Sequence, residues 1–339
     1  MSSDTQMKRD VRDLLGAFAA GAPGAEVYAP GARMDAGHPW GWLEGPDAIG
    51  AWRDELRAAI PGLRRRDLIL VGGENRSDPR FDRNVGAPRA PWIVAALGHY
   101  AGTMTGPLRG IPATGAPVLL RYGEAHWLEG GRLRESRVIL DLVDLMRQCG
   151  TYPLPRAYGV EGPWQGPATQ DGLRLPGPDW TGPDALETVF AMHEALHAFD
   201  GRDLATMDHE RFWTPDFLYH AAGGIGTCQG PEGFRAHHQI PFLRAWPDRA
   251  AEGHFVRVSD GPYAVTGGVV TGTHVGEYLG MTPTGRGMRM PVMDVYRIGP
   301  DGRIAENWLP ADIAGMAAGL GADLLARSAH YAGAPPRAL

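Results

Sequence analysis

The chain has 339 residues, more than the ~100–200 of a typical single domain, so its length favours two domains. Its formal net charge is −6 and its one tight basic cluster is at residues 64–66, which leaves little to neutralise a nucleic-acid backbone. The only lysine, Lys8, argues against lysine-based covalent catalysis, and two cysteines, Cys149 and Cys228, are too few for a disulfide framework or a thiolate zinc site.

The N-terminal segment gives no sign of targeting. Residues 1–10 are polar, and no run in the chain approaches the ~18 apolar residues of a membrane-spanning helix. We therefore expect a cytoplasmic protein with reduced thiols and with neither a membrane nor a nucleic-acid partner.

The first half reads as helices followed by strands. Apolar spacing predicts a helix over Val11–Phe18 and a second one that follows Gly45-Pro46 and stops at Ile60-Pro61. Strands come later, around the turn at residues 129–132, and the half ends at Cys149-Gly150. Residues 151–183 are crowded with proline and glycine and have no periodicity, so they predict a linker.

The second half repeats this order. We expect helices over Asp184–Phe199, Leu204–Phe212 and Gly230–Trp246, the last again ending at proline. The predicted strands are Phe217–His220, His254–Val258, Tyr263–Thr273, Met288–Ile298 and Ile304–Leu309. Helices first and a hairpin-connected meander after them indicate an α+β fold.

The two halves also match in detail. Gly102, Gly106, Gly110, Thr114 and Gly115 recur, with the same spacing, as Gly272, Gly276, Gly280, Thr284 and Gly285. Five matched positions without a gap indicate a tandem duplication. We expect one domain over residues 1–150, a linker over 151–183 and a second domain over 184–339.

One motif indicates zinc chemistry. His193-Glu194-Ala195-Leu196-His197 has the H-E-x-x-H pattern that places two imidazoles on one face of a helix. A downstream third histidine is absent, and Asp203 is the best local substitute. The alternative, which we favour, is an ordinary first helix that carries two histidines, since the helix at Val11–Phe18 has neither.

A second group of ionisable residues is spread over several elements: His220, His237, His238, His274, Asp294 and Asp312. Asp294 lies in the otherwise apolar run Pro291–Tyr296. A carboxyl buried there is either fully hydrogen-bonded or has a raised pKa, and beside an imidazole it is equipped for acid–base catalysis. The alternative is a structural or solvent-facing aspartate.

The first half retains part of this group. Asp35 matches His220, Glu124 matches Asp294, and Met104 stands in place of His274. His126 shares the strand face of Glu124 and is able to replace the missing imidazole. Asp35, Glu124 and His126 are therefore the candidates for a first-domain pocket, which has either diverged or become structural.

The repeat segment carries a family resemblance. Residues 272–285, Asp294-Val295-Tyr296-Arg297 and Glu306-Asn307-Trp308, with Gly230–Arg235 before them, resemble the SnoaL-like polyketide cyclases of the nuclear transport factor 2-like superfamily. The resemblance covers nearly all of residues 184–321 and, more weakly, 8–150. Leu309 departs from the pattern, because family members commonly have an acid after this tryptophan.

The resemblance implies two cone-shaped domains, each with three helices on a curved antiparallel sheet and a deep apolar pocket. Family members pair through their sheets, so two fused copies would form an internal pseudo-dimer, and a further homodimer stays open. It also implies that the first-helix H-E-x-x-H is accidental and that no metal or cofactor is used.

The functional hypothesis is a cofactor-independent cyclase, isomerase or lyase that acts on a small, largely apolar carbonyl compound. Asp294 would move the proton, with His274, His220 and Asp312 as further catalytic candidates. The expected substrate-binding residues are Trp308, Tyr296, Phe234 and His238. The alternatives are a non-catalytic small-molecule-binding or assembly module and a zinc hydrolase.

Overall fold

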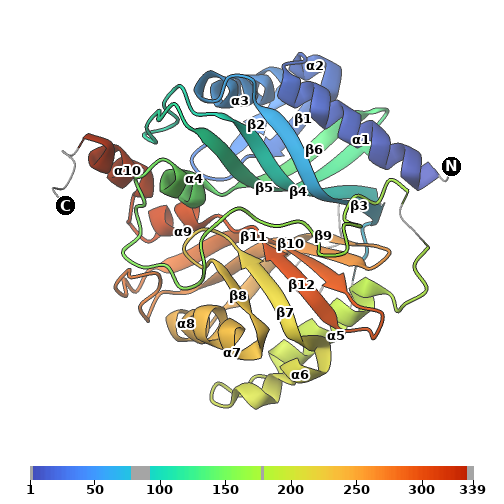
Figure 1. The fold of residues 1–339 in the computed structure, drawn as a ribbon, viewed down its shortest axis with the longest axis vertical. Helices are drawn as coiled ribbons and strands as arrows, with labels where there is room; N and C mark the ends of the chain where they lie inside the picture. The colour runs from blue at the N-terminus through green and yellow to red at the C-terminus, as the bar shows by residue number, and fades with distance from the viewer. Residues whose placement is uncertain (1–2, 78–91, 177–178, 334–339) are drawn as a thin grey trace.

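A computed structural model describes residues 3–77, 92–176 and 179–333, and it contains two α+β domains of the same architecture (Figure 1). The elements of the first domain are α1 (Ser3–Ala20), α2 (Gly24–Val27), β1 (Tyr28–Asp35), β2 (Trp42–Glu44), α3 (Gly45–Ala59), β3 (Arg64–Glu74), β4 (Trp92–Thr103), β5 (Pro117–Glu129), β6 (Arg132–Leu140) and α4 (Leu142–Gln148).

The second domain repeats this order, but its helices are broken into more short segments. Its elements are α5 (Ala185–His197), η2 (Leu204–Met207), α6 (His209–Phe212), β7 (Trp213–Ala221), β8 (Thr227–Gln229), α7 (Gly230–Phe234), η3 (Arg235–Gln239), α8 (Ile240–Ala245), β9 (Ala250–Asp260), β10 (Tyr263–Thr273), β11 (Gly287–Ile298), β12 (Ile304–Leu309), α9 (Ile313–Gly319) and α10 (Leu324–Gly333).

The two sheets have one topology. Their strand orders are β2-β1-β6-β5-β4-β3 and β8-β7-β12-β11-β10-β9. The expected antiparallel sheet is in fact mixed, because β1 pairs with β6, and β7 with β12, in parallel. This parallel pair arises because the last strand of each antiparallel meander, β6 or β12, lies next to the first long strand of its domain and runs in the same direction.

Two predicted helices are interrupted. The segment predicted as one helix over Leu204–Phe212 breaks at Asp208, whose φ of 47° lies in the left-handed region. Within Gly230–Trp246 the turn over Arg235–Gln239 widens into a π-helix just before Pro241, which has no N–H to donate to the preceding turn.

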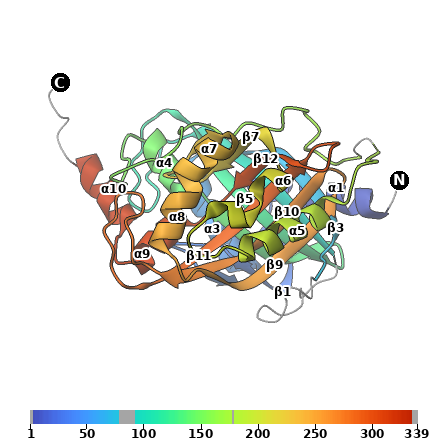
Figure 2. The same ribbon diagram turned by 90° about the horizontal axis from the view of Figure 1, so that it is seen from below.

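The domains pack with their sheets face to face and their long helices outward (Figures 1 and 2). Because side chains alternate along a strand, each sheet has a second apolar face. Ile93, Ala95 and Leu97 of β4 join Met293 and Val295 of β11 in one apolar cluster between the sheets. The tandem domains thus form the sheet-to-sheet pair that the resemblance implied.

The pairing has a local twofold relation. The Asp141 carboxylate caps α4 and accepts a hydrogen bond from the Gly223 backbone N–H of the other domain at 2.8 Å. Asp312 caps α9 and accepts from the His38 backbone N–H at 2.9 Å. Each domain thereby fixes the other through the same helix cap, as expected for an isologous interface.

The segment between the domains runs along the edges of both sheets. Within its described residues it has only isolated bridges, between Leu70 and Leu173 and between Val160 and Thr227. Trp164 inserts into the apolar cluster between the sheets. We keep residues 1–150, 151–183 and 184–339 as the proposed division of the chain. Among the helices described, none has the length and apolarity to span a membrane.

Candidate functional site

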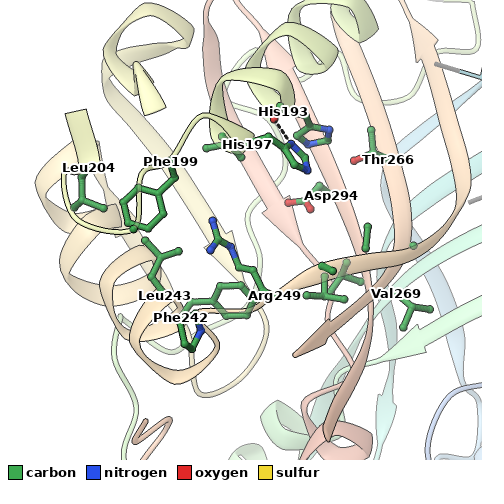
Figure 3. A pocket seen from close by; sticks show the side chains of 18 of the residues that line it. His193, His197, Phe199, Leu204, Phe242, Leu243, Arg249, Thr266, Val269 and Asp294 are labelled. Carbon is green, nitrogen blue, oxygen red and sulfur yellow. Dashed lines mark hydrogen bonds between the residues drawn. The ribbon is translucent and has the colours of Figure 1, made fainter. Parts of the chain in front are cut away.

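A cavity of about 840 Å³ opens in the second domain, at the wide end of the cone. Residues of α5, α8, β9, β10 and β11 and of the loop after α5 line it (Figure 3). Its apolar walls include Phe199, Phe242, Leu243, Val269 and Val270. This is the size range of pockets that bind small organic molecules.

The strand registers show why this cone is hollow. Arg65 pairs with Tyr100 in the first sheet, and Ala251 pairs with Val270 at the matching place in the second. In the same way, the Gly98–Tyr122 pair of the first sheet corresponds to Gly268–Val292 in the second. The large side chains of Arg65, Tyr100 and Tyr122 are thus replaced by those of Ala251, Val270 and Val292. The second cone therefore keeps the backbone of the first and lacks the side chains that fill it.

Asp294 of β11 lies at the floor of this cavity, opposite Thr266 of β10. Its Oδ1 accepts a hydrogen bond from Asn307 Nδ2 at 3.3 Å. Burial raises the pKa of the carboxyl to about 7, although hydrogen bonds from Asn307 and Tyr296 act in the opposite direction. At neutral pH the group is thus present in both its acid and its base form.

Two imidazoles of α5 lie beside Asp294 (Figure 3). His193 and His197 both line the cavity, and His197 Nδ1 is 2.7 Å from the His193 carbonyl oxygen one helical turn earlier. His193 Nε2 is 3.4 Å from the hydroxyl of Tyr296. Tyr296, a predicted substrate-binding residue, is therefore buried directly behind the cavity wall and connects Asp294 to His193.

Three predicted residues face the first domain instead of the cavity. His220 and Trp308 are paired in register and stack with ring centroids 5.5 Å apart, and Trp308 Nε1 donates to the Gln165 carbonyl at 2.9 Å. Asp312 is the helix cap bonded to His38. None of the three is among the residues that line the cavity, because Trp308 pairs with Val295, which faces the opposite side of the sheet from its neighbour Asp294, and His220 lies on the same face as Trp308.

Three others are packed in the aromatic core of the cone. His274 is fully buried, stacks on Trp246 and has its Nδ1 3.2 Å from Thr284 Oγ1. Phe234 packs in the same core, and His238 stacks behind the cavity-lining Phe242 at 5.6 Å. The structure therefore does not bring His274 to Asp294.

The first-domain candidates are divided between two faces. Glu124 and His126 lie inside the cone, where His126 Nε2 is 3.1 Å from Glu124 Oε2 and Tyr100 donates to Oε1 at 2.6 Å. Arg65 pairs with the same carboxylate and lowers its pKa to about 2. Asp35 lies on the other face and pairs with Arg137 at 3.3 Å.

The zinc interpretation lacks a third ligand. Asp203 caps η2 by accepting from the Ala205 N–H at 2.9 Å. In the described part of the chain, no group of three histidine, cysteine, aspartate or glutamate side chains is placed to hold a metal ion.

Sequence reasoning missed several residues of the cavity. In the sequence His193 and His197 form only an incomplete zinc motif, but their i, i+4 spacing does place both on the helix face that lines the cavity. Arg249 and Thr266 also line the cavity. Arg249 had a signal, since it follows Trp246-Pro247 as Leu63 follows Ile60-Pro61 in the first half.

The comparisons with known proteins find similar chains among the solved structures. No curated protein gives a significant match. IdmH from Streptomyces antibioticus, a proposed polyketide cyclase, is 32% identical and aligns over 40% of this chain and 96% of its own, with a TM-score of 0.33. TsrD from Streptomyces laurentii is 25% identical over 40% of this chain and 96% of its own, also with a TM-score of 0.33.

Each of these relatives has the length of one of the two domains. Residues 191–320 match the model of the SnoaL-like polyketide cyclases. The matched range runs from within α5 to α9 and contains every residue that lines the cavity. Through its second domain, the chain belongs to the SnoaL-like polyketide cyclase family, with the nuclear transport factor 2-like fold present twice.

Proposed function

We propose that the second domain is a cofactor-independent acid–base enzyme that carries out a cyclase, isomerase or lyase reaction on a small, largely apolar carbonyl compound. Asp294 takes a proton from the carbon next to the carbonyl and returns it later in the reaction. The observation that supports this most directly is the raised pKa of Asp294, about 7, at the floor of a largely apolar cavity.

The neighbouring groups suit the same chemistry. Abstraction of the proton places negative charge on the carbonyl oxygen, and the imidazoles of His193 and His197 lie beside Asp294 in the cavity (Figure 3). These two imidazoles take the polarising role that the sequence assigned to His220 and His274. Asn307 and Tyr296 hold the carboxyl in place from behind.

The first domain serves in this proposal as a structural partner. Its cone is filled by Arg65, Tyr100 and Tyr122 around Glu124, and its carboxyl is kept ionised by the arginine. The two free buried cysteines fit a protein of the reducing cytoplasm.

The test is proton exchange on a neutral ketone of suitable size, because it needs no knowledge of the natural substrate. We expect the protein to catalyse hydrogen–deuterium exchange at the α-carbon of 2-tetralone in D₂O, followed by NMR. Asp294→Asn should lower this rate by about 100-fold or more, the usual contribution of a general base. The wild-type rate should fall as the pH drops below about 7, because the base form of Asp294 is then lost.

The control is Asp301→Asn, which removes an aspartate from the exposed turn between β11 and β12 and should keep the wild-type rate. If Asp294→Asn retains the rate within a few-fold, Asp294 is not the base. A wild-type protein that is stabilised by 2-tetralone but does not exchange it would indicate a binding module.

A further inference from the structure

Arg249 differs from several arginines whose side chains are withdrawn from solvent and paired with acids. Arg65 pairs with Asp67 and Glu124, Arg121 pairs with Asp141 and Asp144, and Arg297 pairs with Asp171. Arg249 lines the cavity and, within the described ranges, makes no salt bridge or side-chain hydrogen bond; its Cζ lies 5.8 Å from the centroid of the Phe199 ring.

This position is costly for an unpaired charge. Arg249 is half-buried, and the burial lowers the pKa of its guanidinium. A cation withdrawn from water is stabilised only when an anion or several acceptors replace its hydration. Among the residues that the structure describes, no carboxylate of the cavity wall forms a salt bridge with Arg249.

The fold itself does not need an arginine here. Arg249 donates its backbone N–H to the Trp246 carbonyl at 3.2 Å, and Leu63 donates to the Ile60 carbonyl at 3.1 Å after the same X-Pro turn. The matching position in the first domain is thus a leucine, which is 4% exposed and packed in the core. The turn itself therefore does not require an arginine, and the arginine occurs only in the domain with the open cavity.

The surroundings favour an anionic ligand. Arg202 and Arg244 lie exposed at the rim of the same cavity. Its acidic residues are Asp200, exposed in the loop after α5, and Asp294 at the floor. In Figure 3 the Arg249 side chain extends into the cavity between Phe199 and Asp294, from the side opposite Thr266.

We propose that Arg249 binds a carboxylate of the substrate, so that the pocket takes a keto acid. The guanidinium fork matches a planar carboxylate with two parallel hydrogen bonds. The apolar part of the molecule lies against Phe199, Phe242 and Val270, and the reacting carbonyl lies next to Asp294. This substrate class rests on the proposed function, whereas the anion site itself is independent of turnover.

The experiment compares two ligands of one shape. 2-Naphthoate carries a carboxylate, and 2-naphthamide replaces it with a neutral group of similar size. By isothermal titration calorimetry at pH 7, we expect the wild type to bind 2-naphthoate at least 10-fold more tightly. Arg249→Gln should reduce this preference to about 1, and Arg249→Lys should keep part of it.

The matched control is Arg211→Gln. Arg211 is an exposed arginine of α6 outside the cavity, so its removal changes the net charge equally and should preserve the preference. Circular dichroism and thermal melting establish that each variant is folded.

The remaining outcomes overturn the proposal. They are equal binding of the two ligands by the wild type, no binding of 2-naphthoate at millimolar concentration, and an unchanged preference in Arg249→Gln. Failure of the proposed function is distinguishable, because it would leave the preference for 2-naphthoate intact in a wild type that does not exchange the protons of 2-tetralone.

Discussion

At the scale of single residues, Glu124 and Asp294 hold the same register position in the two sheets. Glu124 pairs across the sheet with Ala96, and Asp294 pairs with Thr266. Their carboxyls nevertheless have opposite pKa shifts, to about 2 and about 7. Burial acts to raise the pKa of both carboxyls, so the difference comes chiefly from Arg65, which stabilises the charge of Glu124, while the second domain has Ala251 at the position matching Arg65.

This contrast predicts the effect of neutralising each carboxyl. Glu124→Gln should lower the free energy of unfolding at pH 7 by about 3 kcal/mol, because Arg65 loses a buried charge partner. The stabilisation from Glu124 is present above about pH 4.5 and is lost as the pH falls towards about 2, so the variant should match the wild type at low pH. Asp294→Asn is the register-matched control in urea unfolding and should not destabilise at pH 7; equal destabilisation by both substitutions would contradict this account.

At the scale of elements, one set of strands gives a filled cone in one domain and a hollow cone in the other. β3, β4 and β5 contribute Arg65, Tyr100 and Tyr122, whereas β9, β10 and β11 contribute Ala251, Val270 and Val292 at the matching positions. The helices of the two domains differ as well. In the second domain α5 and α8 line the cavity, and a π-helical turn comes directly before α8. The cavity is therefore obtained by reducing side-chain volume on an unchanged sheet.

Restoring this volume should close the site. The double variant Val270→Tyr/Val292→Tyr places the first-domain tyrosine pair into the second cone and should abolish binding of 2-naphthoate. Because the cavity is already open, we expect the free energy of unfolding to fall by no more than about 1–3 kcal/mol, the cost of overpacking. Calorimetry and urea unfolding measure the two effects. Retained binding in a folded variant would show that these positions do not bound the ligand site.

At the scale of the whole molecule, the segment that connects the domains contains a partly buried acid, Glu161. Glu161, in the connecting segment, accepts a hydrogen bond from the Gly224 N–H at 2.6 Å, and burial together with the charge of Asp141 raises its pKa to about 7. A carboxyl with a raised pKa holds a proton that the unfolded chain has released. Stability therefore falls as the pH rises from about 4.5 to about 7 and stays level above that.

Glu161→Gln should remove this part of the pH dependence. Between pH 5 and pH 8 the wild type should lose about 2 kcal/mol more than the variant, a figure reduced from the full shift because the side chain is partly exposed. Urea unfolding at both pH values measures the difference. Glu129→Gln, in the exposed β5–β6 turn, should keep the wild-type pH dependence. Parallel curves for Glu161→Gln and wild type would contradict the prediction.

Much of the architecture follows from local sequence. The glycine spacing identifies the duplication, proline stops the helices before Pro61 and Pro247, and the apolar run around Asp294 indicates a buried strand. Each of these signals depends only on residues that lie close together in the sequence. The helix break at Asp208 and the parallel strand pairs were not predicted, because they depend on long-range packing.

The sequence by itself determined the fold class, the repeat and Asp294 as a carboxyl in an apolar strand. Only the tertiary structure decided which face of each strand looks into a cavity. Both faces of these sheets are covered, one by helices and one by the other domain, so alternation cannot distinguish Trp308 and His220 on the interdomain face from Asp294 on the cavity face. The tertiary structure also decided which of the two cones is hollow. This depends on the summed volumes of side chains that meet only when their strands pair.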